Sequence, residues 1–203
     1  MRHWRRTGLA GVDEAGRGPL AGPVCAAAVQ LPQGFAPELG RDSKVLSATA
    51  RANAAVVIED QALAFGVGWA SVEEIDAQNI LQATYLAMRR ALQSMNQRCS
   101  QVLVDGNRLP PLEDLCEGAH AVIKGDGLIA EIGAASILAK VARDEYMERM
   151  DQTYPGYGFA QHKGYGTRAH QQALLALGPC PLHRRSFAPV RAALAHQQAE
   201  CAQ

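Results

Sequence analysis

The stretch LAGVDEAGRGP, residues 9–19, guides the interpretation of the whole chain. Its first part, Leu9–Val12, is a short apolar run that predicts a β-strand. Two acidic residues, Asp13 and Glu14, follow the strand, and a glycine-rich turn from Gly16 to Pro19 comes next. Ligands of open α/β sheets bind outside the carboxyl ends of the strands, so this segment predicts both a sheet and the place of its functional site.

The remaining sequence predicts strands that alternate with helices. Further strands are expected at Val24–Gln30, around Phe65–Ala70, and at Gln101–Val104 and Ala119–Ile123. Helices are expected from the Ser47 cap to near Leu63, after the capping box Ser71–Glu74 along a face of Leu81, Tyr85, Met88, Leu92 and Met95, from about Ile129 to Met150, from Thr167 to Gly178, and from Pro189. This order predicts an α/β fold in which helices pack on a mixed sheet.

Charge is distributed unevenly along the chain, although its formal net charge is zero. Residues 152–199 contain five Lys and Arg residues and no Asp or Glu, whereas residues 1–151 contain 15 basic and 19 acidic residues. An acidic body with a basic tail suits an enzyme that holds cations at one place and a polyanion at another. The alternative is that the tail is merely a solvated basic surface.

Length and composition predict one domain, or one domain with a small appendage. We expect a catalytic domain at residues 1–150 and a basic, helical, substrate-binding extension at residues 151–203. The apolar runs are too short to span a bilayer, and the N-terminus lacks the apolar core of a secretory signal, so we expect a cytoplasmic protein, with monomer as the default. The five scattered cysteines form no CxxC pair and indicate reduced thiols rather than zinc ligands.

Four acidic residues are the candidate catalytic and metal-binding groups: Asp13, Glu14, Asp105 and Asp126. Each follows a predicted strand, so the four could converge on one edge of the sheet. Converging carboxylates repel one another unless a cation neutralises them. Oxygen ligands without His or Cys select Mg²⁺ or Mn²⁺, and a pair of such ions about 3.5–4 Å apart is typical of phosphodiester hydrolysis.

The adjacency of Asp13 and Glu14 poses a geometric difficulty, because neighbouring residues of a regular strand point to opposite faces. The turn that begins at Gly16 could relieve it. The same segment is not a phosphate-binding P-loop, because it lacks the Lys-Ser/Thr pair and its acids would repel a nucleotide. Glycines beside Arg17 suit close backbone approach to a ligand, and the 2′-hydroxyl is what distinguishes RNA from DNA.

Ordered motifs along nearly the whole chain resemble bacterial ribonuclease HII. They are DEAGRGP at 13–19, DSK at 42–44, DGN at 105–107, KGD at 124–126, AASILAKVARD at 134–144, YGFAQHKGYGT at 157–167 and HRRSFAPV at 183–190. The resemblance implies a ribonuclease H-like fold with a C-terminal helical extension. It also implies an endoribonuclease that cuts the RNA strand of RNA/DNA hybrids and single ribonucleotides in duplex DNA, 5′ of the ribonucleotide, leaving a 3′-hydroxyl and a 5′-phosphate.

The resemblance further implies roles for individual residues. The four acids would hold the metals; Gly16, Arg17 and Gly18 would read the 2′-hydroxyl; and Tyr165 would stack on the following deoxyribose. Residues expected at substrate phosphates are Ser43, Lys44, Ser136, Lys140, Lys163, Arg184 and Arg185. Two positions depart from the family pattern, Val45 where a second lysine is common and Gly133 where a small non-glycine residue is common.

Two other interpretations are compatible with parts of this pattern. Ribonuclease HIII shares the acids but differs in the glycine loop and has an extra N-terminal domain. A catalytically silent hybrid-binding module would be expected to lack at least one acid, and all four are present.

Overall fold

The computed structural model describes residues 8–35 and 46–201. They form two compact units. The described parts of Met1–Ala15, Cys25–Trp69 and Thr84–Val141 make up the first unit, and Gly16–Val24, Ala70–Ala83 and the described part of Ala142–Gln203 make up the second. Each unit is considered by itself.

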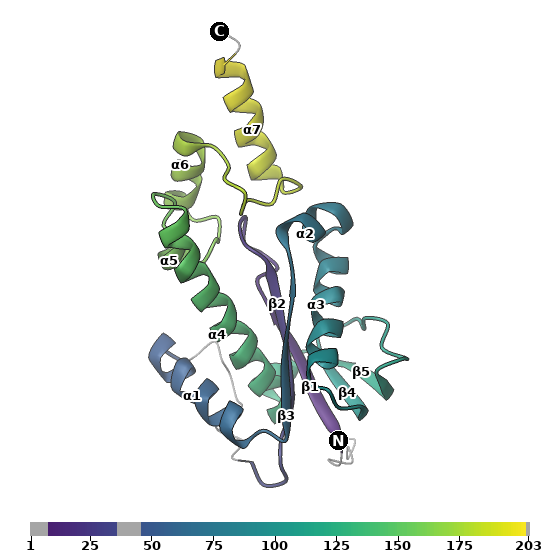
Figure 1. Cartoon of the computed structure of the whole chain (residues 1–203). Coiled ribbons are helices and arrows are strands. Elements are labelled where there is room, and N and C mark those ends of the chain that lie inside the picture. The colour runs from purple at the N-terminus through teal and green to yellow at the C-terminus, as the bar shows by residue number, and fades with distance from the viewer. Residues whose placement is uncertain (1–7, 36–45, 202–203) are drawn as a thin grey trace. The chain divides into compact units, whose positions relative to one another are not determined.

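A five-stranded sheet is the centre of the first unit (Figure 1). Its strands are β1 (Leu9–Ala15), β2 (Val24–Gln30), β3 (Ala64–Ala70), β4 (Cys99–Asp105) and β5 (Cys116–Val122), in the order β3-β2-β1-β4-β5. β1 pairs antiparallel with β2 and parallel with β4, and β4 pairs parallel with β5. The predicted mixed sheet is confirmed, and the carboxyl ends of β1, β4 and β5 lie at one edge.

Seven α-helices are described, together with a short 3₁₀ helix. They are α1 (Ala48–Gln61), α2 (Val72–Gln78), α3 (Ile80–Ser94), η2 (Gly125–Gly127), α4 (Ala130–Thr153), α5 (Phe159–His162), α6 (Arg168–Leu177) and α7 (Ala188–Cys201). The predicted caps at Ser47 and Thr167 accept the N–H groups of Ala50 and His170, and the capping box between Ser71 and Glu74 is present. Within the described residues, no helix is long and apolar enough to cross a membrane.

The helix predicted after the capping box is in fact two helices. Asn79 separates α2 from α3 and has a positive φ of 73° with a ψ of 161°. Its side-chain oxygen accepts the N–H groups of Leu81 and Gln82 and so caps the start of α3. Asparagine is a good N-cap, which explains the break within a continuous apolar pattern.

The backbone of α4 lies directly against β1 at Gly11. A Cβ atom at this position would lie 2.2 Å from the backbone nitrogen of Ile132, so only glycine fits. Beside this contact, Leu9, Leu103 and Ile132 form a buried cluster. The first turns of α4 are therefore held on the sheet face that carries Leu9 and Gly11.

Aromatic and apolar side chains form the core of the second unit. Tyr157, Phe159 and Met147 are buried together with Leu182, and the rings of Tyr157 and Phe159 stack at 5.3 Å. The short helix α5, which was not predicted, contributes Phe159 to this core.

Candidate active site

Asp13 and Asp105 lie beside each other at the ends of neighbouring parallel strands. The register pairs Val12 with Val104, so the next residues of β1 and β4 are Asp13 and Asp105. Adjacent strands are about 4.8 Å apart. The alternation of side chains places both carboxylates on the sheet face of Gly11, against which α4 packs.

Asp126 joins this edge through the turn that follows β5. The N–H of Gly125 donates to Oδ1 of Asp105 at 2.7 Å, so η2 is bonded directly to the end of β4. Asp126 is the middle residue of η2, is 7% exposed, and accepts the N–H of Gly127 at 3.0 Å. Three aspartates from three strand ends are thereby brought to one edge of the sheet.

The Asp13 carboxyl is buried, with only 6% of the residue exposed. Burial raises its pKa well above the usual value, and the negative charges of Glu14 and Asp105 raise it further. A hydrogen bond from the Ser136 hydroxyl and another from the Glu14 N–H, at 2.7 Å, act in the opposite direction. Ser136 lies one helical turn after Ile132 on α4, so the Gly11 contact also positions this hydroxyl.

Glu14 remains part of the regular strand. β1 continues to Ala15 and pairs Glu14 with Ala26, so the turn at Gly16 begins too late to change the direction of its side chain. Strand alternation places Glu14 on the face opposite Asp13. It is half-buried and is close enough to raise the pKa of Asp13.

The acids lie at the same edge of the sheet but are not arranged around a common point as metal ligands would be. Among the residues that the structure describes, no three His, Cys, Asp or Glu side chains are grouped closely enough to hold one metal ion. Asp13, Asp105 and Asp126 each accept a backbone N–H instead. The donor set nevertheless fits a hard divalent cation, because it consists of carboxylate oxygens and because the Asp13 carboxyl is buried beside two further acids.

Arg184 holds the glycine-rich loop that follows β1 and is itself completely buried. It donates to the carbonyls of Gly16 at 2.6 Å, Pro19 at 2.8 Å and Gly22 at 2.8 Å, and more weakly to those of Arg17 and Pro23. The sequence predicted that Arg184 contacts a substrate phosphate. Because its guanidinium is buried among these carbonyls, we correct this assignment to a positioning role.

A second buried arginine, Arg143 of α4, binds the same loop. It donates to the carbonyls of Pro23, Ala21 and Lys163 at 2.9–3.1 Å. Arg143 belongs to the motif AASILAKVARD, but no role was predicted for it, because its partners are backbone carbonyls of distant segments. Its two-sided contact ties the loop to the HKGY segment at residues 162–165.

The loop carbonyls face the buried Arg184 and Arg143, and the tip of the loop lies on the surface. Arg17 and Gly18 are exposed, whereas Gly16 is buried against the Arg143 side chain. Tyr165, 45% exposed, lies next to the tip, with Cε1 3.6 Å from the position that a Gly18 Cβ would occupy. The structure thus brings the predicted 2′-hydroxyl loop and Tyr165 together.

Two hydrogen-bonded histidines, His170 and His183, hold the backbone of Tyr165. His170 Nδ1 bonds to the Tyr165 carbonyl at 2.9 Å, so Nδ1 carries the proton and Nε2 accepts from His183 at 3.1 Å. His183 Nδ1 in turn accepts the Cys180 N–H at 3.0 Å. Burial lowers the pKa of both imidazoles, and that of His183 falls to about 4.

The other predicted phosphate contacts are dispersed. Lys140 is half-buried one turn after Ser136 on α4, Lys163 forms an ion pair with Glu148 at 2.8 Å, and the Arg185 side chain is exposed. Arg185 and Ser186 donate their backbone N–H groups to Asp76, which fixes this segment. The predicted residues Ser43 and Lys44 lie outside the described part of the chain.

Comparison with known proteins identifies the family. The model of the family described as Ribonuclease HII matches residues 10–190. The chain belongs to the ribonuclease HII family. It is therefore a metal-dependent ribonuclease that acts on RNA paired with DNA, and the interpretation as ribonuclease HIII is set aside.

Individual relatives agree with this family assignment. Ribonuclease HII of Acidovorax sp. (strain JS42) is 58% identical over 193 residues, covering 94% of this chain and 90% of that protein. The ribonuclease H2 of Pyrococcus horikoshii OT3 superposes with a TM-score of 0.76 at 25% identity, covering 95% of this chain and 98% of that one. Bst-RNase HIII, solved in complex with Mn²⁺, shares the fold with a TM-score of 0.72 at 20% identity, covering 94% of this chain and 70% of that one.

Two glycines of the loop should respond differently to alanine. A Cβ at Gly16 would lie 2.0 Å from Arg143 Nε on a backbone with φ 99°, whereas a Cβ at Gly18 makes ordinary contact. We expect Gly16→Ala to lower the free energy of unfolding by about 2–4 kcal/mol and Gly18→Ala to change it by less than about 1 kcal/mol. Urea unfolding measures both changes, and equal stabilities of the two variants would contradict the close packing of Gly16 against Arg143.

The histidine pair predicts a loss of stability in acid. The folded pKa of His183, about 4, lies below the unfolded value of 6.5. Between these pH values His183 is protonated in the unfolded chain but not in the folded protein. Its contribution to the free energy of unfolding is therefore complete above pH 6.5 and is lost as the pH falls towards 4, by at most about 3 kcal/mol. Unfolding at pH 7 and pH 4.5 should show a smaller loss for His183→Gln than for the unchanged protein. The half-exposed His120→Gln is the control, and identical losses in all three would disprove the assignment.

Proposed function

We propose that this ribonuclease cuts the RNA strand of RNA/DNA hybrids and single ribonucleotides embedded in duplex DNA. It cleaves 5′ of the ribonucleotide and leaves a 3′-hydroxyl and a 5′-phosphate. The observation that carries the proposal is that Asp13, Asp105 and Asp126 lie at the edge of the sheet where the carboxyl ends of three neighbouring parallel strands meet.

The proposed metal ligands are Asp13, Asp105 and Asp126, with Glu14 as a fourth. Glu14 starts on the other face of β1, but its charge is close enough to Asp13 to raise the pKa of that carboxyl. Two bound Mg²⁺ or Mn²⁺ ions would supply an activated water and stabilise the leaving oxygen. The protein contributes the preorganisation of the carboxylates: backbone N–H groups orient three of them, and Ser136 holds Asp13. The Mn²⁺ complex of Bst-RNase HIII supports the choice of a hard divalent ion for this fold.

The loop at Gly16, Arg17 and Gly18 is proposed to recognise the ribonucleotide. Arg184 and Arg143 bind the carbonyl side of the loop, so its tip is held rigidly at the surface. A rigid loop without side chains at its glycines lets backbone groups approach a 2′-hydroxyl closely. Tyr165 at its side offers an exposed ring for the next deoxyribose.

Substrate phosphates are proposed to contact a wider set of polar groups, with the basic region 151–203 acting as the substrate-binding extension of the catalytic region 1–150. The candidates are Ser43, Lys44, Ser136, Lys140, Lys163 and Arg185. Ser136 would serve the substrate in addition to Asp13, and exposed Arg185 is the strongest candidate within the basic region, because Asp76 fixes its backbone and leaves its side chain at the surface. We propose that the protein acts as a monomer.

Replacement of the central acids should separate cleavage from binding. We expect Asp13→Asn and Asp105→Asn each to reduce the cleavage rate of an RNA/DNA hybrid in Mg²⁺ by about 10³-fold or more, as the loss of several kcal/mol of metal-derived stabilisation implies. Hybrid affinity should change less than about tenfold. Asp60→Asn, at an exposed position of α1, is the matched control. Near-normal cleavage by either variant would refute the metal site, and unaltered protein that binds hybrids without cutting them would indicate a silent binding module.

Matched duplexes test the recognition of single ribonucleotides. Duplexes with no, one or several ribonucleotides should be cut only when a ribonucleotide is present, with the break on its 5′ side. Tyr165→Ala should slow cleavage at a single ribonucleotide by about tenfold or more, because aromatic contacts to nucleic acids contribute about 1–3 kcal/mol. Tyr165→Phe keeps the ring and should retain most of the activity. Equal cutting of the all-DNA duplex, or equal losses in both variants, would contradict the proposal.

A further inference from the structure

An edge strand of the sheet is open to a further strand. Among the described residues, β5 (Cys116–Val122) lies at the end of the strand order. Its register with β4 is regular from Cys116 to Val122, and its sequence, CEGAHAV, contains neither proline nor lysine. Natural edge strands are commonly protected by bulges, proline or lysine, because alternate backbone N–H and C=O groups point away from the sheet. β5 has no bulge, proline or lysine, although its first N–H, that of Cys116, donates to the Leu112 carbonyl of the preceding loop.

A pocket of about 520 Å³ lies along the first half of β5. One wall is β5 itself, from Cys116 to Ala119, and the other is the preceding loop, from Leu109 to Glu113. The loop supplies an apolar lining of two leucines and two prolines. The pocket thus combines an open strand edge with space for an apolar side chain.

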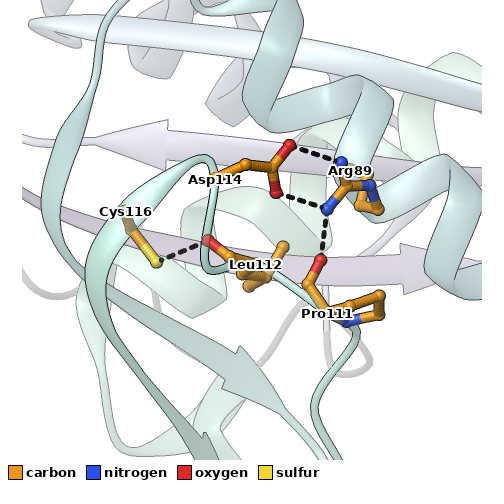
Figure 2. A network of polar contacts seen from close by, with 5 residues as sticks. All are labelled: Arg89, Pro111, Leu112, Asp114 and Cys116. Carbon is orange, nitrogen blue, oxygen red and sulfur yellow. Dashed lines mark hydrogen bonds and ion pairs between the residues drawn. The ribbon is translucent and has the colours of Figure 1, made fainter.

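The loop wall is fixed by a network of polar contacts (Figure 2). Arg89 of α3 forms a two-point ion pair with Asp114, at 2.7 and 2.6 Å, and also donates to the Pro111 carbonyl. Cys116 Sγ bonds to the Leu112 carbonyl at 3.4 Å, which joins the loop to the start of β5. A pocket held in this way is preformed, so a ligand would not have to bear the cost of ordering it.

The charges of the pocket select its partner. Glu113 and Glu117 line it and are exposed, whereas the charge of Asp114 is matched by Arg89. Arg98 is close enough to act on Cys116 but is not part of the lining. Two carboxylates repel nucleic-acid phosphates and attract Lys or Arg. The surface is therefore unsuited to the substrate and suited to a basic polypeptide.

We propose that the edge of β5 and this pocket bind an extended basic segment of a partner protein. The segment pairs its backbone with β5, inserts an apolar side chain between Leu109 and Leu112, and places Lys or Arg at Glu113 and Glu117. The pocket lies at the amino end of β5, whereas Asp126 follows the carboxyl end. The bound segment thus leaves the carboxylate edge of the sheet accessible, and the proposal does not depend on the cleavage chemistry.

The test uses the full chain and the synthetic peptide Ac-(Val-Lys)₄-NH₂. In ¹⁵N-labelled protein, titration should give saturable amide shifts at Glu117–Ala121 and slow the hydrogen exchange of these amides. The double variant E113K/E117K should bind the peptide at least tenfold more weakly and retain normal hybrid cleavage. E59K, which reverses an exposed charge on α1, is the matched control and should bind like the unchanged protein.

Two further peptides separate strand pairing from charge attraction. Ac-(Val-Glu)₄-NH₂ should bind at least tenfold more weakly, and so should an Ac-(Val-Lys)₄-NH₂ carrying N-methyl groups on its valines. The proposal is overturned if the shifts map to Asp13 and Asp105 instead of β5, if E113K/E117K binds as tightly as the unchanged protein, or if the N-methylated peptide binds equally well. Protection of the β5 amides by a DNA duplex would likewise overturn it, in favour of a nucleic-acid surface.

Discussion

The burial of the Asp13 carboxylate is the constraint on which the site depends. A negative charge removed from water beside Asp105 and Glu14 is costly, and the raised pKa of Asp13 expresses that cost. A hydrogen bond from Ser136 offsets part of this cost. Gly11 has no side chain, so the backbone of α4 packs directly on β1 and Ser136 comes within hydrogen-bonding distance of Asp13. Gly11, two residues before Asp13, and Ser136 on α4 thus together position the Asp13 carboxyl.

A comparable principle governs the loop after β1. Its carbonyls are satisfied by two buried guanidinium groups, and a planar guanidinium can bond several carbonyls at once. Arg184 and Arg143 consequently act through the loop and not on a phosphate. In this unit the basic residues divide into buried ones, which shape the surface, and exposed ones such as Arg17 and Arg185, which lie at the surface.

Much of the fold was predictable from local signals. The strand Val24–Gln30, the Ser47 and Thr167 caps and the Ser71–Glu74 capping box are set by neighbouring residues, and the structure has them as predicted. The break at Asn79 was missed because the apolar pattern continues across it. Asp105 was correctly placed at the end of its strand and Asp126 in the turn after the next strand, since that inference needs only strand direction.

Features that depend on distant residues were not predictable in the same way. The role of Arg184 follows from carbonyls more than 160 positions earlier in the chain, and that of Arg143 from the same loop. The continuation of β1 through Glu14 is set by its pairing with β2. Convergence of all four acids was expected from their positions alone, whereas the structure links three aspartates through backbone N–H groups and keeps Glu14 within the regular pairing of β1 with β2.

The central claim is that these carboxylates hold divalent ions against an RNA strand. The most direct measurement is the number of Mn²⁺ ions bound per chain, counted by electron paramagnetic resonance with an RNA/DNA hybrid whose scissile linkage cannot be cleaved. We expect two tightly bound ions in the unchanged protein and at most one in Asp13→Asn. No tightly bound Mn²⁺ in the unchanged protein, or the same two in Asp13→Asn, would contradict the claim.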